Sequence, residues 1–187
     1  MDDRVKSLLL VGVGGQGIIR ASDILTLALM KEGYDAKKSE VHGMAQRGGC
    51  VSSYVRFGAK VYSPLAGRGD VDILVAFEKM ESLRYLDYLR EGGRVIVNDL
   101  EIFPPAVNLG EALYPEKVIP TIAKRFPDVC LVSATAIAEH AGDARMANTI
   151  LLGILSRYLP VSRDIWHDVL GRSFAGALAE KNINVFE

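Results

Sequence analysis

Two glycine-rich segments contain the residues best suited to bind or orient an anionic group. The first reads GVGGQG, and its Gly12, Gly14 and Gly17 fit the spacing G-x-G-x-x-G. A short apolar run precedes this segment and a helical pattern follows it. In such a turn the first glycine permits the tight bend, the second lets a phosphate approach the backbone, and the third lets helix and strand pack closely. The free N–H groups at the start of the helix would favour an anion.

This glycine loop has two interpretations. In the first it binds a dinucleotide, and Glu40, about 20 positions on, completes the site by its position. In the second the glycines serve only a tight turn between strand and helix. The loop also contains an additional Gly15 and a Gln16, whose amide offers donors and an acceptor of its own. The spacing leaves both interpretations open.

The second segment, VHGMAQRGG, follows an expected strand. Arg47 presents a planar fork of donors, and the neighbouring glycines leave room for a carboxylate, phosphate or carbonyl to approach it. Alternatively, Arg47 pairs with a nearby carboxylate in an ordered turn. The candidate ligand or interface residues of both loops and of a later helix are Gly12, Gly14, Gly15, Gln16, Gly17, His42, Gly43, Met44, Gln46, Arg47, Gly48, Gly49 and Asn148.

The cysteines and histidines predict neither a metal site nor a catalytic residue in this chain. Cys50 and Cys130 are the only cysteines, and we expect both to be reduced, buried and inert. Two thiols cannot supply the four ligands of an iron–sulfur cluster. The three histidines lie far apart without a ligand spacing, so we expect no zinc site.

Short apolar runs alternate with amphipathic segments along the chain. We expect strands over 7–13, 35–41, 50–57, 71–77, 94–98 and 129–133, and helices over 18–32, 79–90, 116–125, 146–158 and within 162–182. Gly92 and Gly93 are expected to close the second helix, and 106–113 to form a short hairpin. This order predicts one α/β domain over 1–187, with a Rossmann-like, open and mostly parallel sheet that carries helices on both faces.

The expected helix over 146–158 is apolar around most of its circumference. It also contains Asn148 and Gly153, and the glycine costs about 1 kcal/mol relative to alanine. Close packing would offset that cost. The helix is therefore buried either in the core of its own domain or against a partner.

Composition excludes several classes of partner. The 187 residues hold 22 basic and 23 acidic side chains, which gives a net charge of −1 and no electrostatic case for nucleic acid or an anionic membrane. The apolar runs fall short of the ~20 residues that span a bilayer. The start MDDRVK lacks the pattern of a signal peptide, so we expect a cytoplasmic protein.

Three motifs in order, GVGGQGI, EVHGMAQRGG and RMANTILLG, resemble the gamma-type subunit or domain of the 2-oxoacid:ferredoxin oxidoreductases. Within that family, the loop VHGMAQRGG looks most like the small (beta) subunit of the indolepyruvate type. The resemblance covers essentially the whole chain.

The resemblance implies a complex that oxidatively decarboxylates a 2-oxoacid with coenzyme A and passes electrons to ferredoxin. Thiamine diphosphate, Mg²⁺ and 4Fe-4S clusters are then expected on one or more catalytic partner chains. This chain has too few cysteines for the clusters and no GDG…N segment for the diphosphate. It is therefore expected to be an accessory subunit that is inactive alone. Whether the isolated chain forms a homodimer stays open.

Two other functions compete with this interpretation. One is a stand-alone NAD(P)- or FAD-binding oxidoreductase that uses the glycine loop and Glu40. The other is a binding module that uses the Arg47 loop for a different acidic metabolite or protein.

Overall fold

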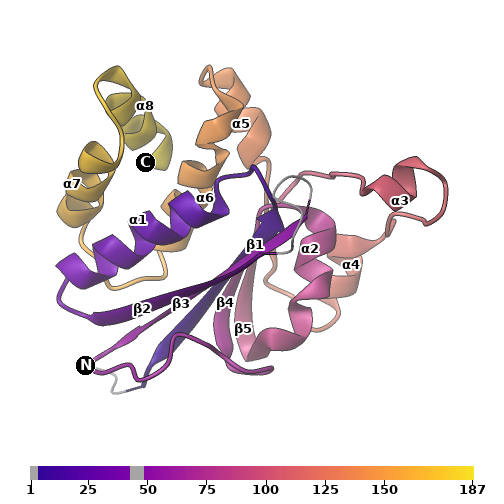
Figure 1. Cartoon of the computed structure of the whole chain (residues 1–187), viewed down its shortest axis with the longest axis horizontal. Helices are drawn as coiled ribbons and strands as arrows, with labels where there is room; N and C mark the ends of the chain where they lie inside the picture. The colour runs from indigo at the N-terminus through magenta and orange to yellow at the C-terminus, as the bar shows by residue number, and fades with distance from the viewer. Residues whose placement is uncertain (1–3, 43–48) are drawn as a thin grey trace.

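A six-stranded sheet forms the centre of the molecule, which is a computed structural model that describes residues 4–42 and 49–187 (Figure 1). Its spatial order is β2-β3-β1-β4-β5-β6. The strands are β1 (Lys6–Val13), β2 (Asp35–His42), β3 (Cys50–Gly58), β4 (Val71–Ala76), β5 (Leu89–Asn98) and β6 (Cys130–Val132). β1, β4 and the second half of β5 are apolar and buried, as strands covered on both faces should be. The described residues of the edge strands β2 and β6 are only partly buried or exposed.

One strand runs against the other five. β1, β4, β5 and β6 pair in parallel, whereas β3 pairs antiparallel with both β1 and β2. The expected α/β class and mostly parallel sheet are therefore confirmed. β2 and β3 are the exception to the parallel order, because they follow one another as an antiparallel pair. The short connection between them permits a hairpin, whereas a parallel pair needs a crossover of a dozen or more residues.

Helices cover both faces of the sheet (Figure 1). Side chains alternate between the faces along β1: Leu8 and Leu10 join one apolar cluster, and Leu9 and Val11 join the other. The first cluster lies under α1 (Ile18–Lys31), α5 (Ala134–His140), α6 (Ala147–Ser156), α7 (Arg163–Ser173) and α8 (Ala177–Phe186). The second includes residues of η1 (Leu86–Tyr88) and α4 (Val118–Ala123), together with Leu83 of α2 (Lys79–Arg84).

Several expected boundaries were wrong. The second helix ends at Arg84 rather than Arg90, and Gly92 and Gly93 lie inside β5. There they form a bulge against β4, because Val71 pairs with Leu89 while Ile73 pairs with Arg94. Gly92 has a φ of +66°, a conformation that favours glycine, so it accommodates the bulge instead of ending a helix.

Two further segments differ from expectation. The hairpin expected over 106–113 is absent: a short helix, α3 (Pro105–Asn108), begins this segment, with proline at its first position where no N–H is needed. α5 was not anticipated, although its alanine-rich stretch and the following Gly142 are helix signals. The 3₁₀ turn η2 (Ala144–Met146) then leads into α6.

The two alternatives for the apolar helix are resolved in favour of the chain's own core. Leu151 and Leu155 of α6 are buried within this chain alone. A Cβ added at Gly153 would lie 2.1 Å from the carbonyl oxygen of Phe186 in α8. Close contact between these two helices thus offsets the cost of a glycine within α6.

Candidate functional site at the glycine loop

The glycine loop opens onto a crevice at the carboxyl ends of β1 and β4. β1 leads into α1 on one face of the sheet, whereas β4 leads into α2 on the other face. The crevice therefore lies between two neighbouring parallel strands whose following helices cover opposite faces. Open α/β proteins bind ligands at this place. A pocket of about 340 Å³ lies there, and its lining includes Gly15, Gln16, Gly17, Phe77, Asn98, Thr135, Arg145 and Asn148.

Three glycines of the loop have a structural reason. Gly15 and Gly17 have φ angles of +106° and +78°, which favour glycine. A Cβ at Gly12 would lie 2.8 Å from Cβ of Phe77. The turn therefore requires these glycines whether or not a ligand binds.

Gln16 fastens the loop to the neighbouring strand. Its Oε1 accepts a hydrogen bond from the Val13 N–H at 2.7 Å, and its Nε2 donates to the Phe77 carbonyl at 2.9 Å. The extra amide noted in the sequence therefore satisfies two backbone groups. One N–H that a phosphate could otherwise use is already occupied.

Two asparagines of the crevice are also bound to the fold. Asn148 at the start of α6 is 7% exposed and donates to the Gly17 carbonyl at 3.4 Å. Asn98, at the end of β5, donates to the Phe77 carbonyl at 3.1 Å and to Oγ1 of Thr135 at 2.9 Å. Asn148 is thus brought to the glycine loop across 131 residues of sequence. Asn98 and Thr135 were not among the predicted site residues.

The second glycine-rich segment returns to the same place. The Gly14 N–H donates to the Gly49 carbonyl at 2.9 Å, and the backbone of His42 pairs with Val51 in the β2–β3 hairpin. The two motifs are therefore in direct contact through Gly14 and Gly49. The residues Gly43, Met44, Gln46, Arg47 and Gly48 lie outside the described residues.

Glu40 does not complete a dinucleotide site. β3 lies between β1 and β2, so Glu40 on the edge strand is separated from the glycine loop by an intervening strand. Its carboxylate pairs with Lys38. The acidic residue that matched by sequence position is thus misplaced in space, which counts against the dinucleotide interpretation.

Arg145 is the one charged residue among the described residues that line the crevice. Its guanidinium bonds to Asp143 at 2.6–3.0 Å and is 87% exposed. These hydrogen bonds lower the pKa of Asp143 to about 2. Arg145 was not among the predicted site residues. Its position as the first residue of the motif RMANTILLG, just before α6, is the sequence signal that could have identified it.

Cys50 lies near the loop but is a poor nucleophile. Its thiol donates to Oε2 of Glu81 at 2.9 Å and lies 3.1 Å from the Tyr85 hydroxyl. Burial, reinforced by the Glu81 carboxylate, raises the pKa of Cys50 to about 11. The thiol therefore stays protonated near neutral pH.

Across residues 4–42 and 49–187, no cluster of three or more histidine, cysteine or acidic side chains could hold a metal ion. Within the same ranges, each helix is too short or too polar to cross a bilayer.

The fold is that of an open α/β protein with a crevice at its glycine loop. A model of the pyruvate ferredoxin/flavodoxin oxidoreductase family matches residues 7–187. The chain belongs to this family, and the resemblance drawn from the motifs is confirmed.

Two relatives are named as subunits of an indolepyruvate oxidoreductase. The indolepyruvate oxidoreductase subunit IorB of Pyrococcus horikoshii is 36% identical over 186 residues, which is 97% of this chain and 92% of that protein. IorB of Archaeoglobus fulgidus is 40% identical over 163 residues, 86% of this chain and 81% of that protein.

A solved structure has the same fold. The pyruvate oxidoreductase subunit PORC of Thermotoga maritima superposes with a TM-score of 0.75 at 20% identity, covering 98% of this chain and 94% of that one.

Proposed function

We propose that this chain is the accessory subunit of a 2-oxoacid:ferredoxin oxidoreductase of the indolepyruvate or arylpyruvate type. Family membership over residues 7–187 supports the enzyme class. The type is supported by two relatives named IorB, at 36% and 40% identity, and by the loop VHGMAQRGG. The complex would carry out the coenzyme A-dependent oxidative decarboxylation of the 2-oxoacid in the cytoplasm and pass the electrons to ferredoxin.

The observation that carries the accessory role is the chemistry of the crevice. The amides of Gln16, Asn98 and Asn148 are hydrogen-bonded to backbone carbonyls of the same chain. Arg145 alone is charged among the described lining residues, which include no carboxyl, imidazole, amine or thiol group that could act as an acid or base or activate the Thr135 hydroxyl. The crevice is thus suited to contact rather than to catalysis.

The redox chemistry then belongs to catalytic partner chains. We assign thiamine diphosphate, Mg²⁺ and the 4Fe-4S clusters to those chains, because this chain has only two cysteines and Cys50 is hydrogen-bonded to Glu81. The glycine loop, the segment 42–49 and Asn148 form the proposed contact surface for the partner or its ligands. The hydrogen bond between Gly14 and Gly49 supports treating the two loops as one surface.

Reconstitution tests this function directly. The isolated chain should be colourless and should not oxidise any 2-oxoacid. Adding the catalytic chain should restore 2-oxoacid-dependent ferredoxin reduction, with an aryl-substituted pyruvate preferred over pyruvate. Absorption near 400 nm by the isolated chain, or turnover without the partner, would contradict the accessory role. A preference for pyruvate would contradict only the assigned type.

The stand-alone oxidoreductase is tested separately by thermal shift with NAD(H), NADP(H) and FAD. The position of Glu40 and the occupied Val13 N–H lead us to expect no stabilisation at micromolar ligand. An increase in melting temperature with one of these nucleotides would favour the competing function.

A further inference from the structure

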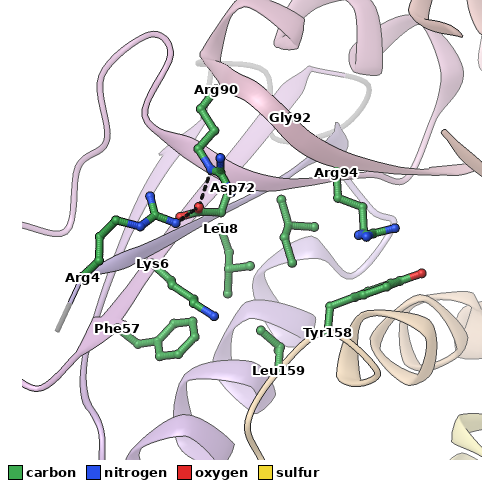
Figure 2. A pocket seen from close by; sticks show the side chains of 11 residues that line it. Arg4, Lys6, Leu8, Phe57, Asp72, Arg90, Gly92, Arg94, Tyr158 and Leu159 are labelled. Atoms are coloured by element: carbon green, nitrogen blue, oxygen red, sulfur yellow. Dashed lines mark hydrogen bonds and ion pairs between the residues drawn. The ribbon is translucent and has the colours of Figure 1, made fainter. Parts of the chain in front are cut away.

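A second pocket, at the opposite end of the sheet from the glycine loop, is lined by positive charge. This basal pocket has a volume of about 330 Å³ and lies at the amino ends of β1 and β4, beside the bulge in β5 (Figure 2). Among the described residues, four cationic side chains line it, against one carboxylate, that of Asp72. The cations are Arg4, Lys6, Arg90 and Arg94. This local excess contrasts with a net charge of −1 for the whole chain.

Asp72 holds two of the cations in place. Its carboxylate accepts from Nε of Arg90 at 2.7 Å and from the Ser7 N–H at 2.8 Å, and it also pairs with Arg4. Burial opposes the charge on Asp72, but these hydrogen bonds outweigh it and lower the pKa of the carboxyl group. Asp72 therefore stays ionised and fixes both guanidinium groups along one wall.

The other two cations have no such counter-charge. Among the residues that the structure describes, neither Lys6 nor Arg94 forms an ion pair. The guanidinium of Arg94 lies 4.2 Å from the centre of the Tyr158 ring, which orients it without neutralising it. Figure 2 shows the Lys6 amine and the Arg94 guanidinium on two sides of the pocket. Both charges line the same pocket, so an anion bound there would be attracted by each.

An apolar pocket adjoins the charged one. It has a volume of about 230 Å³, shares Arg4, Lys6 and Phe57 with the basal pocket, and is completed by groups that include Tyr34 and Pro160. Tyr34 and Phe57 pack edge to face with ring centres 5.2 Å apart. The two pockets together offer a charged compartment beside an aromatic wall.

We propose that the basal pocket binds a small organic phosphate, with the phosphate group between Lys6 and Arg94 and an apolar body against Phe57 and Tyr34. A phosphate monoester carries a charge of about −1.5 to −2 at neutral pH and three acceptor oxygens. It therefore matches several converging cations better than a single carboxylate does. Arginine forks and a lysine are the usual donors to phosphate. This site is separate from the glycine-loop crevice and does not depend on the proposed function.

Isothermal titration of the full chain at low ionic strength tests the proposal with three probes: phenyl phosphate, inorganic phosphate and phenylacetate. Phenyl phosphate should bind most tightly, because it alone fills both compartments with matching charge. The double variant Lys6→Gln/Arg94→Gln should weaken its binding by about tenfold or more. The charge-matched control Lys117→Gln/Lys124→Gln, at the exposed positions that flank α4, should leave binding unchanged.

A folding check accompanies the titration. The double variant removes the contact between Arg94 and Tyr158, so its stability must be checked. The single variant Lys6→Gln keeps that contact, and it should weaken phenyl phosphate binding while melting like the wild type.

Three results would overturn the proposal. The wild type could fail to bind phenyl phosphate, or the control could lose as much affinity as the double variant, which would indicate nonspecific charge. The third result would be that the catalytic partner chain abolishes phenyl phosphate binding and that the double variant weakens assembly with this partner. The pocket would then be a contact for acidic residues of the partner.

Discussion

Asn148 leaves no free space for a side chain at Gly17: a Cβ there would lie 2.5 Å from its Nδ2. The same amide donates to the Gly17 carbonyl, and the φ of Gly17 is +78°. Conformation and contact together therefore require glycine where the loop enters α1.

Gly17→Ala should destabilise the chain by about 2–3 kcal/mol, because it adds displacement of Asn148 to the cost of a left-handed alanine. Gly15→Ala provides the matched control, since Gly15 also has a positive φ but nothing lies within 4 Å of its added Cβ. It should cost only about 1–2 kcal/mol. Urea unfolding measures both variants, and equal losses would mean that the Asn148 contact contributes nothing.

Gln16→Glu should show stability that depends on pH. A protonated carboxyl can accept from the Val13 N–H and donate to the Phe77 carbonyl, as the amide does, whereas the carboxylate would repel that carbonyl. The pKa of the new side chain should thus be raised in the folded state. Relative to wild type, the stability of the variant should be highest at acidic pH and should fall as pH rises through that pKa. Gln16→Ala should lose about 1–3 kcal/mol with no such pH dependence.

Arg47 remains the residue of the second loop that we expect to matter most for assembly. It precedes Gly49, whose carbonyl accepts from Gly14, by two positions. Arg47→Lys keeps the charge but loses the paired fork, so the reconstituted complex should be measurably impaired. Arg47→Ala should cost more, on the order of 2–5 kcal/mol if a buried charged partner is left alone.

Both Arg47 variants should melt like the wild type before the partner is added. Titration into the catalytic chain, followed by 2-oxoacid-dependent ferredoxin reduction, measures the effect. Full activity of Arg47→Ala would reduce the loop to a structural turn, whereas a collapse in melting temperature would assign Arg47 to an internal ion pair.

Cys50 should react slowly with iodoacetamide at pH 8. Burial and the Glu81 carboxylate raise its pKa to about 11, so little thiolate is present and the rate should keep rising up to that pH. The Cys130→Ser background removes the other thiol. Adding Glu81→Gln should speed the reaction, because it removes the acceptor and its negative charge. A rate that levels off near pH 8.5, the value for a free thiol, would show that Cys50 is not shielded.

Gly153→Ala and Gly171→Ala should change stability in opposite directions. A Cβ at Gly153 meets the Phe186 carbonyl at 2.1 Å, so alanine should cost about 1–3 kcal/mol through overpacking between α6 and α8. Gly171 lies within α7 and has nothing within 4 Å, so alanine there should stabilise by about 0.5–1 kcal/mol. Thermal melting compares the two. Stabilisation by Gly153→Ala would remove the packing explanation for this glycine.

The local patterns of the sequence were sufficient for most strands, for α1, and for the family. The apolar run before Gly12 and the helical spacing after Gly17 depend on neighbours only a few residues apart, so the strand, turn and helix could be predicted. Local patterns failed at Gly92 and Gly93. Two adjacent glycines are equally compatible with the end of a helix and with a bulge, and pairing with β4 made them a bulge.

The site itself depended on contacts between residues distant in sequence. From the sequence alone, the motifs identified the glycine loop, the segment 42–49 and Asn148 as candidates, but they did not distinguish a nucleotide site from a structural turn. In the tertiary structure β3 lies between β1 and β2, which separates Glu40 from the glycine loop. Asn148 and Gly49, in contrast, are hydrogen-bonded to the loop. Spacing along the chain specifies local conformation, whereas the order of strands in a sheet is set by the pairing of distant segments. The glycine motif was therefore evident in the sequence, whereas the position of Glu40 and the charge gathered around the basal pocket became apparent only once the strands were paired.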